Sequence, residues 1–173
     1  TMVRLLGGHM IAAGDIFRSF KDDPELQQIM AAGANVPSET FARIVLPYFS
    51  RPDFAGEPLI LSGVGRKNGE QQVIVRAAEE ADHPLKAVIL LDIPNTVVME
   101  RYQMSLGSRD RGERLDDGDQ AIIASRLEHF AIDVVPVIDY YRQHGLLIEV
   151  DGSQSAEEVI IAIINGLLLS KRI

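Results

Sequence analysis

Short apolar runs alternate with segments of helical periodicity along the whole chain. Four of these runs are predicted strands, at residues 9–11, 59–61, 87–91 and 146–150. The last two are apolar almost throughout, as expected of strands that are covered on both faces. Strands that alternate with helices are joined by right-handed crossovers, so the pattern predicts an α/β fold with a parallel sheet.

Polar residues mark where the intervening helices begin. Asp23 is predicted to cap a helix that has Pro24 at its first position, and Ser38 is predicted to cap a second helix through residue 49. Ser155 and Glu158 have the spacing of a capping box ahead of a helix over 159–169. The other helices are expected at residues 67–81, 95–104, 119–134 and 137–143.

Composition and charge narrow the class of protein. A length of 173 residues and an apolar fraction of 46% predict one compact domain, and the net charge of −8 argues against a binder of nucleic acid or acidic membranes. The longest apolar runs are too short to cross a bilayer, and the absence of cysteine excludes disulfides and thiol catalysis. We therefore expect a soluble, cytoplasmic protein.

Arginine far outnumbers lysine, at 13 residues against 4. Arginine suits bidentate binding of phosphate, although a compositional habit of the source genome explains such an excess equally well. The positions of the arginines along the chain decide between phosphate binding and a compositional habit, because ligands in parallel α/β folds bind beyond the carboxyl ends of the strands. Glycines commonly follow strands because they are ordinary turn residues. That habit does not explain why Arg18 and Arg66 follow two of the predicted strands.

The order of seven segments resembles adenylate kinase and its nucleoside monophosphate kinase relatives. Residues 12–18 (AAGDIFR) resemble the family's Ser-Thr-Gly-Asp-hydrophobic-hydrophobic-Arg segment, and residues 61–66 (LSGVGR) resemble its Leu-Asp-Gly-Phe-Pro-Arg segment. The other matching segments are 33–37 (GANVP), 90–101, 111–117 with 126–127, 136–141 and 150–153. The resemblance implies a three-layer P-loop-type fold, with a small helical insertion over about 14–49 that binds the nucleoside monophosphate and a short lid over about 102–117.

The resemblance also implies a reaction and its site residues. The reaction would move the γ-phosphoryl group of ATP, accompanied by Mg²⁺, to a nucleoside monophosphate, in a monomer with no nucleic-acid or membrane partner. The implied acceptor-binding residues are Gly14, Arg18, Val36, Gly63, Arg66 and Glu70, with Arg18 and Arg66 on the phosphate. The implied catalytic residues are Arg101, Arg114 and Arg126, and the implied ATP-binding residues are Thr1, Arg101, Arg111 and Gly152. No residue is expected to bind the metal directly, but Asp15 is a candidate for its outer shell.

Four departures from the family pattern leave alternatives open. The phosphate-binding loop Gly-x-x-x-x-Gly-Lys-Ser/Thr is absent from the 173 residues, and we expect it to precede Thr1, which would be its last residue; the alternative is a protein without the loop. Ser62 replaces an acidic residue that supports magnesium, Ala13 replaces a threonine, and Gly65 replaces a proline. A catalytically degenerate nucleotide-binding protein and a P-loop kinase of another small metabolite are therefore alternative interpretations.

Glu70 is the position that bears on nucleobase preference. The family often has glutamine there, which reads the adenine edge of the acceptor. An ionised carboxylate only accepts hydrogen bonds, so Glu70 would suit a base edge that presents donors, such as guanine. The alternative is that Glu70 begins an exposed helix and contacts nothing.

Overall fold

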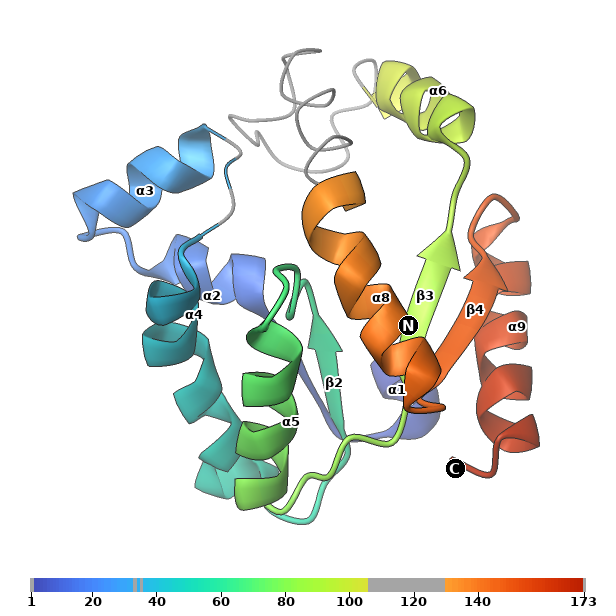
Figure 1. Ribbon diagram of the computed structural model, residues 1–173, viewed down its shortest axis with the longest axis horizontal. Helices are drawn as coiled ribbons and strands as arrows, with labels where there is room; N and C mark the ends of the chain where they lie inside the picture. The colour runs from blue at the N-terminus through green and yellow to red at the C-terminus, as the bar shows by residue number, and fades with distance from the viewer. Residues whose placement is uncertain (1, 33, 35, 106–129, 173) are drawn as a thin grey trace. The chain divides into compact units, whose positions relative to one another are not determined.

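The computed structural model describes residues 2–32, 34, 36–105 and 130–172 (Figure 1). The chain divides into two compact units. The first unit comprises Thr1–Leu85 and His129–Val137, and the second comprises Lys86–Glu128 and Ile138–Ile173. All four predicted strands are present, and they form two parallel pairs, one in each unit. The α/β class and the parallel pairing are therefore confirmed.

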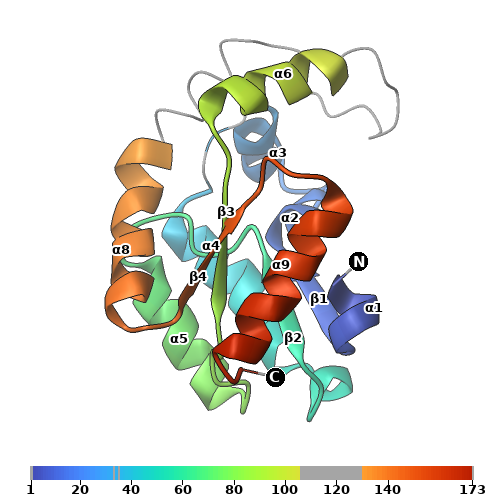
Figure 2. The same cartoon turned by 90° about the vertical axis from the view of Figure 1, so that its right-hand side faces the viewer.

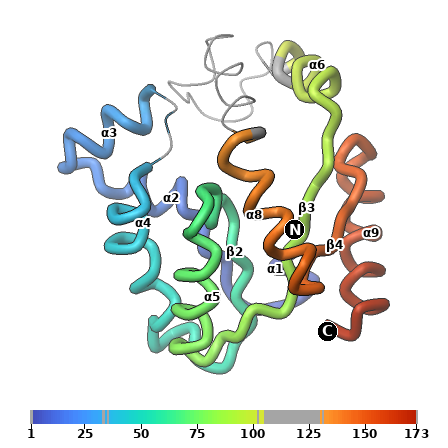
Figure 3. Tube along the Cα trace, in the orientation of Figure 1, coloured from blue at the N-terminus to red at the C-terminus, as the bar shows by residue number. Residues whose placement is uncertain are grey.

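The first unit is built on β1 (His9–Ala12) and β2 (Leu59–Ser62), which pair in register from His9 opposite Leu59 to Ala12 opposite Ser62. Figure 3 follows the trace from one strand to the other through the intervening helices. The helices of this unit are α1 (Met2–Leu6), α2 (Ala13–Ser19), α3 (Pro24–Ala31), α4 (Ser38–Val45) and α5 (Glu70–Glu80). The 3₁₀ segments η1 (Leu46–Ser50) and η2 (Pro52–Phe54) lead from α4 towards β2.

Local capping explains the start of α3, and it fails to explain the start of α4. Asp23 caps α3 as predicted, because its carboxylate accepts a hydrogen bond of 3.0 Å from the N–H of Leu26. The prediction that Ser38 caps α4 is wrong: Pro37 occupies the N-cap position and Ser38 is the first helical residue. The Ser38 hydroxyl instead donates to Glu70.

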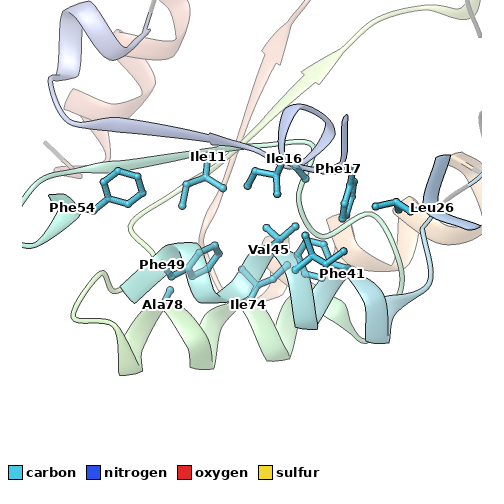
Figure 4. Close-up of a cluster of buried hydrophobic side chains, with 12 residues drawn as sticks. Ile11, Ile16, Phe17, Leu26, Phe41, Val45, Phe49, Phe54, Ile74 and Ala78 are labelled. Atoms are coloured by element: carbon cyan, nitrogen blue, oxygen red, sulfur yellow. The ribbon is translucent and has the colours of Figure 1, made fainter. Parts of the chain in front are cut away.

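The hydrophobic core of the first unit is formed by β1, by the segment that follows β1, and by α5. Figure 4 shows Phe41, Val45 and Phe49 facing Ile11 and the residues of α2. The buried cluster consists of Ile11, Ala13, Ile16, Phe17, Leu26, Phe41, Ile44, Val45, Phe49, Phe54, Ile74 and Ala78. Residues between positions 14 and 49 therefore share one hydrophobic core with β1 and α5.

The second unit is built on β3 (Val88–Asp92) and β4 (Leu147–Asp151), which pair from Val88 opposite Leu147 to Asp92 opposite Asp151. Its other elements are α6 (Asn95–Ser105), as predicted, and α9 (Ala156–Leu169), which lies alongside β4 (Figure 2). The predicted capping box is confirmed: the Ser155 hydroxyl accepts from the N–H of Glu158, and the Glu158 carboxylate accepts from the N–H of Ser155.

Helix α8 (Val135–Gln143) crosses from the residues of the first unit into those of the second. It begins two residues earlier than predicted, because Pro136 lies in the first turn, where a missing N–H breaks no helical hydrogen bond. Most of the helix predicted over 119–134 lies outside the described residues, and its described end, Phe130–Val134 (η3), is a π-helical segment. No helix in the described part of the chain is long and apolar enough to cross a membrane.

Candidate active site

Two arginines of the first unit follow the carboxyl ends of its paired strands. Because Ala12 pairs with Ser62, the chain leaves β1 and β2 at the same edge of the sheet. A Cβ atom added to Gly14 would lie 3.3 Å from Nη1 of Arg18, and one added to Gly63 would lie 3.4 Å from Nη2 of Arg66. Each guanidinium therefore lies against a glycine that follows a strand, and the structure places both cations at the strand ends.

Arg18 forms an ion pair with Asp15 on the surface of α2. The side chains of both residues are substantially exposed, at 44% for Arg18 and 71% for Asp15. Exposed ion pairs of this kind contribute at most about 1 kcal/mol, because water screens them. The Arg18 guanidinium is therefore only weakly held by Asp15.

The loop after β2 carries Arg66, and its backbone path depends on a glycine, Gly65. Gly65 has a φ angle of 70°, which proline cannot adopt, so this loop follows a path that the family's proline at this position would not permit. Glu70 then begins α5 and is only 7% exposed. The interpretation in which Glu70 is exposed and contacts nothing is therefore wrong.

Both oxygens of the Glu70 carboxylate accept hydrogen bonds. Oε1 accepts from the hydroxyl of Ser38 at 2.8 Å, and Oε2 accepts from the N–H groups of Arg66 and Lys67 at 3.1 and 3.2 Å. The sequence gives no local signal for the contact with Ser38, which lies 32 positions away. Capping is the commoner use of a serine hydroxyl at that place, so the local sequence alone predicts a helix cap.

The remaining predicted acceptor residue, Val36, is partly buried and packs against the core of the first unit. Its neighbours Gly33 and Asn35 lie outside the described residues. All six predicted acceptor residues thus belong to the first unit: Gly14, Arg18, Val36, Gly63, Arg66 and Glu70.

In the second unit the structure brings Arg101 and Gly152 together. The Arg101 guanidinium donates to the carbonyl oxygens of Gly152, Ser153 and Gln154 at 2.9, 2.8 and 3.2 Å. A Cβ atom at Gly152 would lie 2.6 Å from Cγ1 of Ile93, so any larger residue there would force the Ile93 side chain to shift. Arg101 therefore fixes the backbone that follows β4.

Asp151 ends β4 beside this turn. The hydroxyl and the N–H of Ser153 hold the pKa of its carboxyl below the ordinary value, and the nearby Arg101 charge acts in the same direction. The turn after β4 thus combines a fixed carboxylate with a fixed guanidinium in the second unit.

Four predicted residues, Thr1, Arg111, Arg114 and Arg126, lie outside the described part of the chain. The described residues contain no group of three or more histidine or acidic side chains that could hold a metal ion. Ser62 is exposed at the end of β2, and Asp15 is paired with Arg18.

The fold defines an α/β protein with parallel strand pairs, and comparison with known proteins gives its family. The chain is 32% identical to an adenylate kinase of Tropheryma whipplei (strain Twist) over 159 residues, which cover 91% of this chain and 83% of the relative. It is 29% identical to an adenylate kinase of Parvibaculum lavamentivorans over 171 residues (99% and 82%), and 28% identical to one of Xylella fastidiosa (strain 9a5c) over 162 residues (91% and 84%). No protein-family model matches the chain. The chain belongs to the adenylate kinase family and is a nucleoside monophosphate kinase.

Proposed function

We propose that this protein transfers the γ-phosphoryl group of ATP to a nucleoside monophosphate and releases two nucleoside diphosphates. The observation that supports this reaction most strongly is the pair of arginines, Arg18 and Arg66, that follows two adjacent parallel strands in a member of the adenylate kinase family. Ligands of parallel α/β folds bind at this edge, and arginine suits a phosphate dianion.

In the proposed acceptor site, Arg18 and Arg66 hold the monophosphate. Gly14 and Gly63 let the ligand approach the backbone closely, because neither carries a Cβ atom. Val36 packs near the base. The proposed fold is the three-layer P-loop type, in which residues of about 14–49 form the insertion that binds the monophosphate.

At the proposed donor site, Arg101 and Gly152 contact ATP together with Thr1 and Arg111. Arg101, Arg114 and Arg126 neutralise the negative charge that the donor and acceptor phosphates bring together in the transition state. The segment of about 102–117 acts as a short lid that excludes water while the phosphoryl group moves. These assignments rest on the family resemblance and, for Arg101 and Gly152, on the contact between them.

Mg²⁺ would enter with ATP and supply positive charge next to its phosphates. We assign Asp15 to the outer water shell of the ion, as the family resemblance implies. When the acceptor phosphate takes Arg18, the Asp15 carboxylate loses its partner and can accept hydrogen bonds from water. Ser62 cannot supply a negative charge at the end of β2.

The proposal is tested by the change Arg66→Ala in the full-length protein, with ATP, Mg²⁺ and AMP and a coupled assay for diphosphate. We expect kcat/KM for AMP to fall about 100-fold to 1,000-fold, by analogy with removing one charge-stabilising donor from an active site. Arg76→Ala, which removes an exposed arginine from the same unit, serves as the matched control and should change little. Unchanged turnover in Arg66→Ala would contradict the assignment of the acceptor site.

The second candidate function is nucleotide binding without useful turnover, which Ser62 and Ala13 favour because both replace polar groups of the family pattern. It predicts that calorimetry detects nucleotide binding while the coupled assay detects no diphosphate. The appearance of product in the wild-type protein would exclude it.

A further inference from the structure

Glu70 connects two segments of the first unit that are distant in sequence. It is the first residue of α5, and its carboxylate accepts a hydrogen bond from Ser38, the first residue of α4. The same carboxylate accepts from the consecutive N–H groups of Arg66 and Lys67. One buried side chain therefore ties the start of α4 to the backbone that carries Arg66.

The loop that this carboxylate holds would otherwise be poorly constrained. Between Ser62 and Glu70 it contains Gly63, Gly65 and Gly69, all with φ angles in the left-handed region. Glycine loses more conformational freedom on folding than any other residue, so a loop with three of them needs external contacts to keep one path. The two hydrogen bonds to Oε2 provide such contacts at Arg66 and Lys67.

The same hydrogen bonds leave little capacity for reading a nucleobase. A carboxylate oxygen offers about two lone-pair directions, and Oε2 already accepts two N–H groups. Oε1 accepts one hydroxyl, that of Ser38. A guanine edge with two donors would have to displace Ser38 or a backbone N–H. The geometry therefore favours a use of Glu70 other than base recognition.

We propose that Glu70 and Ser38 are positioning residues of the acceptor site, which fix the backbone of Arg66 so that its guanidinium meets the acceptor phosphate. This inference rests on the proposed phosphoryl transfer to a nucleoside monophosphate. It assigns both residues an effect on the phosphate end of the acceptor, and that effect is the same for every nucleobase.

Substitution by glutamine separates positioning from base reading. The amide oxygen of Glu70→Gln can accept the two N–H groups while its NH₂ group donates to the Ser38 hydroxyl, so all three hydrogen bonds survive. A base-reading residue would instead gain donors and change its preferred base. Glu70→Ala removes all three bonds, and Ser38→Ala removes one from an exposed residue without leaving a cavity.

The test is steady-state kinetics of the full-length protein with AMP, GMP, CMP and UMP in turn. We expect Glu70→Ala to raise the KM of every accepted monophosphate about tenfold, and Ser38→Ala to raise it about threefold, as expected for the loss of several hydrogen bonds and of one. The KM for ATP should stay unchanged, and Glu70→Gln should keep the wild-type order of base preference. Glu79→Gln and Ser50→Ala, at exposed positions of the same unit, are the matched controls.

Each outcome decides a separate statement. A changed base preference in Glu70→Gln, or unchanged acceptor KM values in both alanine variants, would overturn the positioning role. If Glu70→Ala fails to fold, the test rests on Ser38→Ala and on the conservative variant Ser38→Thr. Ser38→Thr keeps the hydroxyl and should therefore show the wild-type KM. A wild-type protein that phosphorylates none of the four acceptors would instead overturn the proposed function.

Discussion

Two neighbouring glycines between α1 and β1 show how strongly single positions constrain the first unit. Gly7 and Gly8 both have φ angles in the left-handed region, at 74° and 78°. A Cβ atom at Gly7 would meet nothing within 4 Å, whereas one at Gly8 would lie 1.9 Å from the carbonyl oxygen of Pro58. That oxygen accepts the N–H of His9 at the start of β1.

The pair therefore gives a matched prediction. Gly7→Ala should lower the free energy of unfolding by about 1 kcal/mol, the cost of the left-handed conformation alone. Gly8→Ala should lower it by about 3 kcal/mol or more, because it also forces the backbone of Pro58 away from His9. Urea denaturation of both variants measures the difference, and equal losses would contradict the close approach of the two segments.

Residue positions were predictable where they follow from the neighbouring strand, and not where they depend on long-range contact. Arg18 and Arg66 could be placed at one edge of the sheet, because each follows a strand and parallel strands end together. The hydrogen bonds of Glu70 could not be predicted from sequence. It depends on Ser38, 32 positions earlier, and on the path of a glycine-rich loop.

At the scale of elements, the capping box of α9 can be tested by titration. The hydroxyl and N–H of Ser155 lower the pKa of the Glu158 carboxyl below its ordinary value. A carboxyl whose pKa is lower in the folded state stabilises the fold above its unfolded pKa, and this contribution disappears as the pH falls through the folded pKa.

Ser155→Ala should therefore raise the pKa of Glu158 towards its ordinary value and lower the free energy of unfolding at neutral pH. The part of this loss that comes from Glu158 should vanish under acidic conditions that protonate it in both proteins. An NMR titration of the Glu158 carboxyl, with the exposed Glu157→Gln variant as control, measures the shift. A Glu158 pKa that does not move would show that Ser155 is not its partner in solution.

Element boundaries were predictable where capping is local. The side chains of Asp23 and Ser155 each accept a hydrogen bond from the N–H group three residues later, so the sequence spacing is enough to predict both caps. Local spacing does not predict the start of α4, because the Ser38 hydroxyl bonds to another helix. It does not predict the start of α8 either, because Pro136 fits the first turn of a helix as well as a boundary between helices. Helix α2 was not predicted, since Ala12 and Ala13 carry no capping group.

At the scale of the whole molecule, alternation of strands and helices was enough to predict the α/β class and the parallel pairing, because both follow from the connection between successive elements. The division into two units was not predictable from that alternation. The predicted acceptor residues all lie in the first unit, and the contact between Arg101 and Gly152 lies in the second.

The central claim is that this chain phosphorylates a nucleoside monophosphate, and direct product analysis tests it most simply. The full-length protein is incubated with ATP, Mg²⁺ and each of AMP, GMP, CMP and UMP, and the nucleotides are separated and quantified. The account predicts that ATP is converted to ADP with an equal amount of the acceptor's diphosphate for at least one monophosphate. ATP that remains intact with all four acceptors, or ADP without an acceptor diphosphate, would contradict it.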